Sequence, residues 1–225
     1  MLIILFSLIL IGLIFLLLIL RTINRDLFLL KRVQNLYLKA SLLSVILVSI
    51  IGSIYFFEFR RLEEAHLANK IDKFLLFEQA EKEVLRNDLL RDVSSYVNNE
   101  KIALENLYAL SQKFKLEDEY LISSLAYKKI LDRNIEVISG DIIAEYAQVL
   151  FFLNKNIFTE EIIEILKLAL TKNPKEPLAL TLNGLRYIQA GEIEKAKKEW
   201  EKAIEFLENI QEKNVLKAAI KNLNT

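Results

Sequence analysis

The sequence predicts an all-α protein in which two N-terminal transmembrane helices precede a helical domain. Two uncharged apolar segments, 1–20 and 40–57, have the composition and length of membrane spans. After residue 62, prolines occur only at Pro174 and Pro177, and apolar residues recur at steps of three and four. That spacing is the periodicity of an amphipathic α-helix, and few helix-breaking residues interrupt it.

The first 60 residues form a predicted membrane anchor, with a connector at 21–39 between the two spans. The 20 residues of the first span, at about 1.5 Å per residue, give a helix of about 30 Å, which matches the hydrocarbon core of a bilayer. The second span ends in aromatic residues at 55–57, which suit the membrane–water interface. No basic segment precedes the first span and no small-residue cleavage site follows it, so we expect an anchor rather than a cleaved signal peptide.

The charges of the connector predict which side of the membrane it occupies. It carries five basic residues against a single acidic one, Asp26, so the positive-inside rule places it in the cytoplasm. Both termini then lie outside. In a Gram-negative cell, that predicts a two-pass protein of the inner membrane with its helical domain in the periplasm. The margin is small, because the twenty residues after the second span hold four more basic residues: Arg60, Arg61, Lys70 and Lys73.

Composition excludes several classes of function. The chain has 30 basic and 30 acidic residues, so no net charge points to nucleic acid as a partner. It has no cysteine, and therefore no disulfide, thiolate metal site or covalent haem attachment of its own. The lone histidine, His66, has no second histidine or cysteine with which to complete a metal site. No phosphate-binding loop or hydrolase motif is present, so we expect a protein without catalytic residues, metal or cofactor.

A 34-residue period marks the C-terminal part of the chain. When 143–176 is placed above 177–210, similar residues coincide at an offset of 34. A helix–turn–helix unit of this length is typical of tetratricopeptide (TPR) repeats. Gly184 and Ala196 would allow the two helices of a repeat to approach closely, and Gly191 would end the first helix. The matched positions are Ile162 with Ala196, Leu166 with Trp200, Ala169 with Ala203, and Leu170 with Ile204.

The repeat divides the rest of the chain into a lead-in and a solenoid. A less regular copy of the pattern starts at Leu107, and a polar helix that could cap the solenoid ends the chain. The predicted divisions are an amphipathic lead-in at 61–103 and a TPR domain at 104–225, with repeats at about 104–137, 143–176 and 177–210 and the cap at 211–223.

TPR solenoids present a concave groove, which the first helix of each repeat lines. We expect an apolar groove here, better suited to the apolar face of an amphipathic helix than to an acidic peptide. The competing interpretation is that some of these residues pack between repeats and never contact a ligand. The candidate binding residues are Tyr108, Gln112, Lys115, Ala147, Phe151, Asn154, Thr181, Leu185 and Gln189.

Several segments, taken in order, resemble the cytochrome c-type biogenesis family CcmI, also called CycH. They are "AYKKIL", "IIAEYAQVLFF", a TEE at 159–161, an ALTKNP at 169–174, the leucine-rich 178–191, and Trp200. The resemblance covers most of the chain, including the two apolar segments. It departs in the connector, because the family commonly has a longer cytoplasmic loop with a zipper-like helix. The role of that loop is therefore in doubt for this chain.

The resemblance implies a membrane-anchored chaperone of c-type cytochrome biogenesis. In that family the TPR domain binds the C-terminal helix of apocytochrome c and delivers the apoprotein to thioredox and haem-lyase subunits of the haem-ligation (Ccm) machinery, without attaching haem itself. Two alternatives stay open. One is a TPR scaffold that organises another envelope assembly and has no unfolded client. The other is a subunit for assembly of a formate-dependent nitrite reductase.

Overall fold

The structure, a computed structural model, describes residues 31–223, except for the side chains of 31–42, 56–63 and 134. Within these residues the chain is all-helical, with no strand, which confirms the predicted fold class at the level of all-α. The predicted span at 1–20 and the first part of the connector lie outside the described residues. The chain divides into two compact units, Met1–Ala68 and Asn69–Thr225.

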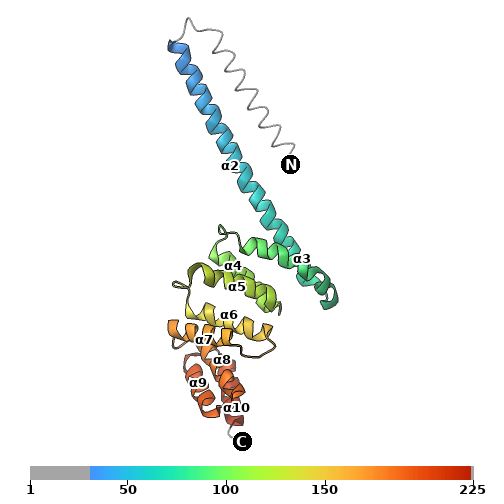
Figure 1. Cartoon of the computed structure of the whole chain (residues 1–225), viewed down its shortest axis with the longest axis vertical. Helices are drawn as coiled ribbons and strands as arrows, with labels where there is room; N and C mark the ends of the chain where they lie inside the picture. Colours follow the sequence, from blue (N-terminus) through green and yellow to red (C-terminus); the bar gives the residue numbers. More distant parts are fainter. Residues whose placement is uncertain (1–30, 224–225) are drawn as a thin grey trace. The chain divides into compact units, whose positions relative to one another are not determined.

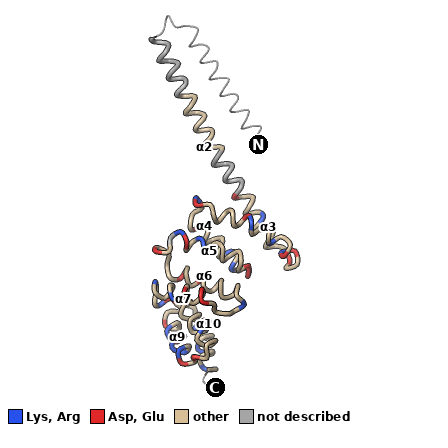
Figure 2. The backbone as a smooth tube through the Cα atoms, viewed as in Figure 1, with Lys and Arg blue, Asp and Glu red and all other residues tan. Residues whose placement is uncertain are grey.

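The first described element is the helix α2 (Lys31–Leu76), 46 residues long (Figure 1). It contains the second apolar segment, and nearly all of the side chains described at 43–55 are exposed. Figure 2 shows no charged residue in this stretch. The hydroxyls of Ser49 and Ser53 donate to the carbonyls of Val45 and Ser49 at 2.8 Å, so they are satisfied within the helix itself. Over the residues that could be searched, no helix has both the length and the apolarity needed to cross a membrane.

The second unit consists of short helices that follow one another in chain order (Figure 1). The most extensive contacts join α4 with α5, α6 with α7, and α8 with α9, and α10 packs on α9. The elements are α3 (Gln79–Val97), α4 (Leu104–Leu116), α5 (Tyr120–Asn134), α6 (Gly140–Leu153), α7 (Glu160–Lys172), α8 (Pro177–Gln189), α9 (Ile193–Phe206) and α10 (Ile210–Asn222).

Three of these helices begin at side chains that accept a hydrogen bond from the first turn. Thr159 accepts from the Ile162 amide at the start of α7, and Glu176 accepts from the Ala179 amide at the start of α8. Asn209 accepts from the amides of Gln211 and Glu212, at 2.8 and 3.4 Å. Free amides at a helix start need such partners, so the sequence itself sets where α7, α8 and α10 begin. Gly191, at φ +74°, makes the turn from α8 to α9.

The positions that recur in the sequence belong to the core of the second unit. Ile162 and Ala196, Leu166 and Trp200, and Ala169 and Ala203 are all buried, and Leu170 and Ile204 are both half-buried. The corresponding positions of the first helix pair are buried too: Leu107, Leu110, Ser111 and Phe114 on α4, and Ser123, Tyr127 and Ile130 on α5. The 34-residue offset therefore relates residues that occupy equivalent core positions.

Candidate functional site

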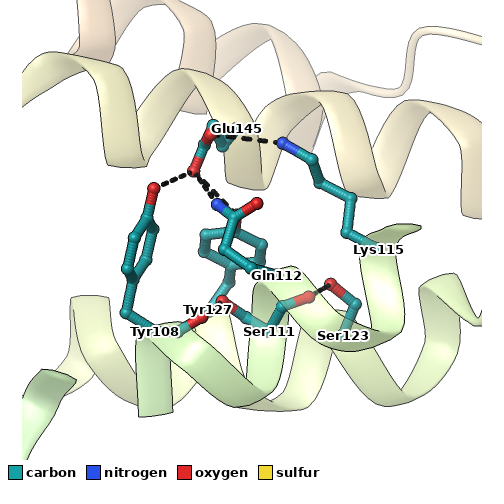
Figure 3. A network of polar contacts seen from close by, with 7 residues as sticks. All are labelled: Tyr108, Ser111, Gln112, Lys115, Ser123, Tyr127 and Glu145. Atoms are coloured by element: carbon teal, nitrogen blue, oxygen red, sulfur yellow. Dashed lines mark hydrogen bonds and ion pairs between the residues drawn. The ribbon is translucent and has the colours of Figure 1, made fainter. Parts of the chain in front are cut away.

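The three candidate residues on α4 converge on one carboxylate of α6, Glu145 (Figure 3). The Tyr108 hydroxyl donates to Glu145 Oε2 at 3.0 Å, and the Gln112 amide donates to the same oxygen at 2.6 Å. The Lys115 ammonium lies 3.2 Å from the other oxygen, Oε1. Residues at 108, 112 and 115 share one face of α4, because helical positions three and four apart are neighbours. That face is turned towards α6.

A fourth donor comes from α5, where Tyr127 is completely buried. Its hydroxyl donates to Glu145 Oε2 at 2.8 Å and accepts from the Gln112 amide at 2.8 Å. The ring of Tyr127 meets Tyr108 edge-on, with centroids 6.3 Å apart, and stacks on Tyr146 of α6 at 6.1 Å. One carboxylate thus joins α4, α5 and α6 through side chains that are largely shielded from water.

Burial and a nearby carboxylate raise the pKa of two tyrosines in this network. Burial raises the pKa of Tyr127, and the negative charge of Glu145 raises it further. The pKa of Tyr108 is raised for the same two reasons. Lys115 and Glu145 are about four-fifths buried, so their attraction is less screened than that of an exposed pair. Each donor side chain in the network has a partner, so the bonds link α4, α5 and α6.

Glu145 was missed as a candidate residue, although the sequence holds a signal for it. It is the one charged residue between 142 and 153, a segment that is otherwise almost wholly apolar. A carboxylate in such a helix needs donors from its neighbours, and the spacing of 108, 112 and 115 places three donors on one face of a nearby helix. Pairing the two observations would have predicted the contact.

The α6 candidates need a correction. Ala147 is fully buried and Phe151 is 4% exposed. The Phe151 ring packs against Phe158 at 4.5 Å and Phe152 at 5.7 Å, measured between centroids. Both residues belong to the core, so they do not line an open surface. Asn154 is half-buried at the end of α6, where its amide donates to the Leu150 carbonyl at 2.8 Å.

The α8 candidates are more accessible. Thr181 is half-buried; its hydroxyl donates to the Pro177 carbonyl at 2.8 Å, and its own carbonyl accepts from the Trp200 indole at 2.9 Å. Leu185 is half-buried and packs on the core of Leu180 and Trp200. Gln189 is exposed, and its amide donates to a carbonyl in the α6–α7 connection at 2.7 Å. The structure therefore does not gather the nine candidates into a single surface.

Thr181 also lines an open pocket between α8 and α10, which we call the α8–α10 pocket. Its volume is about 660 Å³. Two carboxylates, Glu176 and Glu212, contribute to the lining, and no lysine or arginine does. The apolar lining residues are Pro177, Leu178, Leu207, Val215 and Leu216.

The described residues offer no group of three or more histidine, cysteine, aspartate or glutamate side chains that could hold a metal ion. His66 is exposed on α2. Comparison with known proteins adds no relative, because no family model and no curated protein matches the chain. The function must therefore be argued from the residues and their geometry.

Proposed function

We propose that this protein is a membrane-anchored TPR protein that binds a helical segment of a client protein. In this proposal residues 1–20 and 40–57 are the anchor, and the helix pairs α4–α5, α6–α7 and α8–α9 are three repeats with α10 as their cap. The client is an apocytochrome c, held by its C-terminal helix and passed to thioredox and haem-lyase subunits. The protein is a chaperone and not an enzyme.

The observation that carries the repeat assignment is the burial of equivalent positions in successive helix pairs. Ser123 of α5 donates its hydroxyl to the Ser111 carbonyl of α4 at 2.8 Å, and both serines are completely buried. The equivalent positions of the last pair are Gly184 and Ala196, which are also buried. Small residues therefore occupy both positions in the first and last pairs, as in the TPR pattern, whereas the middle pair has the buried aliphatic residues Leu150 and Ile162 there.

The anchor is supported by the surface of α2. Leu43, Val45, Val48 and Ile54 are each more than half exposed, in a stretch with no charged residue. Apolar side chains on this scale are costly in water, and a bilayer would cover them. The orientation, with the helical domain in the periplasm, follows from the basic connector.

The client assignment rests on the resemblance to the CcmI family and on the chemistry of the chain. A protein without cysteine cannot exchange disulfides with the haem-binding thiols of an apocytochrome, so it can hold that client without cross-linking to it. Helical repeats bury helical segments in grooves through apolar anchors, which fits a client helix that is exposed only before haem insertion.

Peptide binding tests the proposal. The full chain, in nanodiscs of zwitterionic lipid, is titrated into a fluorescent peptide from the C-terminal helix of a c-type cytochrome, with empty nanodiscs as the blank. Saturable binding that the apocytochrome competes away better than the holocytochrome supports the chaperone. Binding of neither, by a chain that is helical by circular dichroism, refutes it and favours a scaffold without an unfolded client.

A further inference from the structure

The α8–α10 pocket is an apolar surface that the helical domain leaves open, whereas the part of the expected binding face on α4 and α6 is largely occupied by the domain's own contacts. Near α4 and α6, the donors around Glu145 are all engaged, and Ala147 and Phe151 are in the core. We infer that the α8–α10 pocket is the anchor site for an apolar side chain on a basic, amphipathic helix of the partner. This inference rests on the proposed function and names the part of the domain that performs it.

The lining of the pocket can hold a large apolar side chain. Leu216 is buried and gives the pocket a solid apolar wall, while Leu178 and Leu207 are half-buried beside it. Val215 is 67% exposed, which leaves a branched aliphatic side chain in water unless a partner covers it. The volume of about 660 Å³ lies in the range of pockets that bind small ligands or anchor side chains.

The charges of the lining select for a basic partner. Glu176 and Glu212 face no lysine or arginine within the lining. The N-termini of α8 and α10 also lie at the pocket, and helix N-termini with unpaired amides would attract an anion. Their first amides are already bound, however, by Glu176 and by Asn209. Glu176 is 5% exposed and its carboxylate is bound at the start of α8, so the exposed carboxylate of Glu212 is the charge of the lining that a partner meets.

The partner chemistry follows from these two properties together. An apolar residue fills the pocket, and lysine or arginine on the same segment lies near Glu212 at its rim. A helix supplies the apolar and the basic residues at fixed spacing. Residues three and four apart form its apolar face, and basic residues can lie beside that face. A segment with acidic flanks would meet Glu212 with like charge and bind more weakly.

Designed peptides test the inference with the full chain in zwitterionic nanodiscs. One probe is an 18-residue amphipathic helix with leucine on one face and lysine on the other, and its twin carries glutamate in place of lysine. Fluorescence anisotropy gives Kd for each, with empty nanodiscs subtracted. We expect the lysine probe to bind and the glutamate twin to bind at least tenfold more weakly.

Two pairs of variants locate the site. Val215→Ser removes an exposed aliphatic group from the pocket, and Ile210→Ser removes one from the same helix, 73% exposed but outside the lining. We expect Val215→Ser to raise the Kd of the lysine probe about tenfold, the effect of losing one buried aliphatic contact, and Ile210→Ser to leave it unchanged. Glu212→Gln should weaken binding and its salt dependence, whereas Glu208→Gln, just outside the pocket, should not.

The outcomes separate this inference from the proposed function. Equal effects of Val215→Ser and Ile210→Ser, or equal binding of the two probes, would overturn the anchor site. If the cytochrome peptide binds but Val215→Ser leaves its Kd unchanged, the chaperone stands and the anchor site falls. If the lysine probe binds at the pocket while no cytochrome peptide binds, the anchor site stands and the proposed client falls.

Discussion

The indole of Trp200 lies directly against Gly184 of the facing helix. A Cβ placed on residue 184 would come within 2.3 Å of Cδ1 and Nε1 of that indole. The ring cannot easily move aside, because its Nε1 donates to the Thr181 carbonyl at 2.9 Å. Glycine at 184 is therefore required by the close approach of α8 and α9, and Trp200 fills the space that the missing side chain leaves.

Gly184→Ala should destabilise the helical domain by about 1–3 kcal/mol, the usual effect of adding a group to a packed core. Alanine is the better helix former by about 1 kcal/mol, which opposes the loss without cancelling it. Urea unfolding followed by circular dichroism measures the change. The smaller ring of Trp200→Phe should relieve the clash with the alanine side chain at position 184. The double variant should therefore lose less stability than the sum of the losses of the two single variants. Unchanged stability of Gly184→Ala would contradict the packing described.

Tyr127→Phe tests the network around Glu145. Removing this hydroxyl takes one donor from Glu145 and one acceptor from Gln112, both in a largely buried setting. We expect a loss of about 1–2 kcal/mol in the free energy of unfolding. Tyr108→Phe is the matched control, because it removes another donor to the same carboxylate from a half-buried residue, where water can replace the hydroxyl. Tyr108→Phe should lower the free energy of unfolding by clearly less than Tyr127→Phe does. Equal losses in the two variants would argue that Tyr127 is not buried more deeply than Tyr108.

Alkaline pH should unfold the helical domain before the native tyrosines ionise. Burial raises the pKa of Tyr146 to about 12, and burial together with a hydrogen bond to Asp118 raises the pKa of Tyr120 to about 12. Tyrosine in the unfolded chain has a pKa of about 10. Above about pH 10 the unfolded state therefore holds fewer protons than the native state, so stability falls as pH rises.

The measurement follows tyrosinate absorbance and helical circular dichroism together from pH 8 to pH 12. We expect both signals to change in a single transition well above pH 10. Tyr146→Phe should move the midpoint of that transition to higher pH, because phenylalanine has no proton to lose on unfolding. Tyrosinate absorbance that develops fully around pH 10 while the helices persist would show that these hydroxyls are open to solvent.

The sequence predicted the helices and most of their core, because both follow from local patterns. The 34-residue offset placed Ile162, Leu166 and Ala169 at the same core positions as Ala196, Trp200 and Ala203. The binding face was predicted less well. α6 is apolar around most of its surface, so periodicity alone could not tell which of its residues face a groove and which face a neighbouring helix.

The α8–α10 pocket could not be predicted in the same way. It depends on where the chain turns after α9 and on how the last helix packs on α9, two relationships that no repeat position encodes. Thr181 was found from the spacing, but Val215 and Glu212 belong to the predicted cap and were expected to be only a polar covering. The pocket therefore draws on residues of the predicted cap as well as on α8.

Phe151→Ala separates the core from the binding face. Because Phe151 is 4% exposed and packs on Phe158, its truncation leaves a cavity and should cost about 3–5 kcal/mol of stability. Since it lies in the core and not at the α8–α10 pocket, the molecules that stay folded should bind the lysine probe with unchanged Kd. Anisotropy at low temperature, corrected for the folded fraction by circular dichroism, measures this. Weaker binding without a loss of stability would show that Phe151 contacts the partner. That result would support the groove predicted from the repeat spacing.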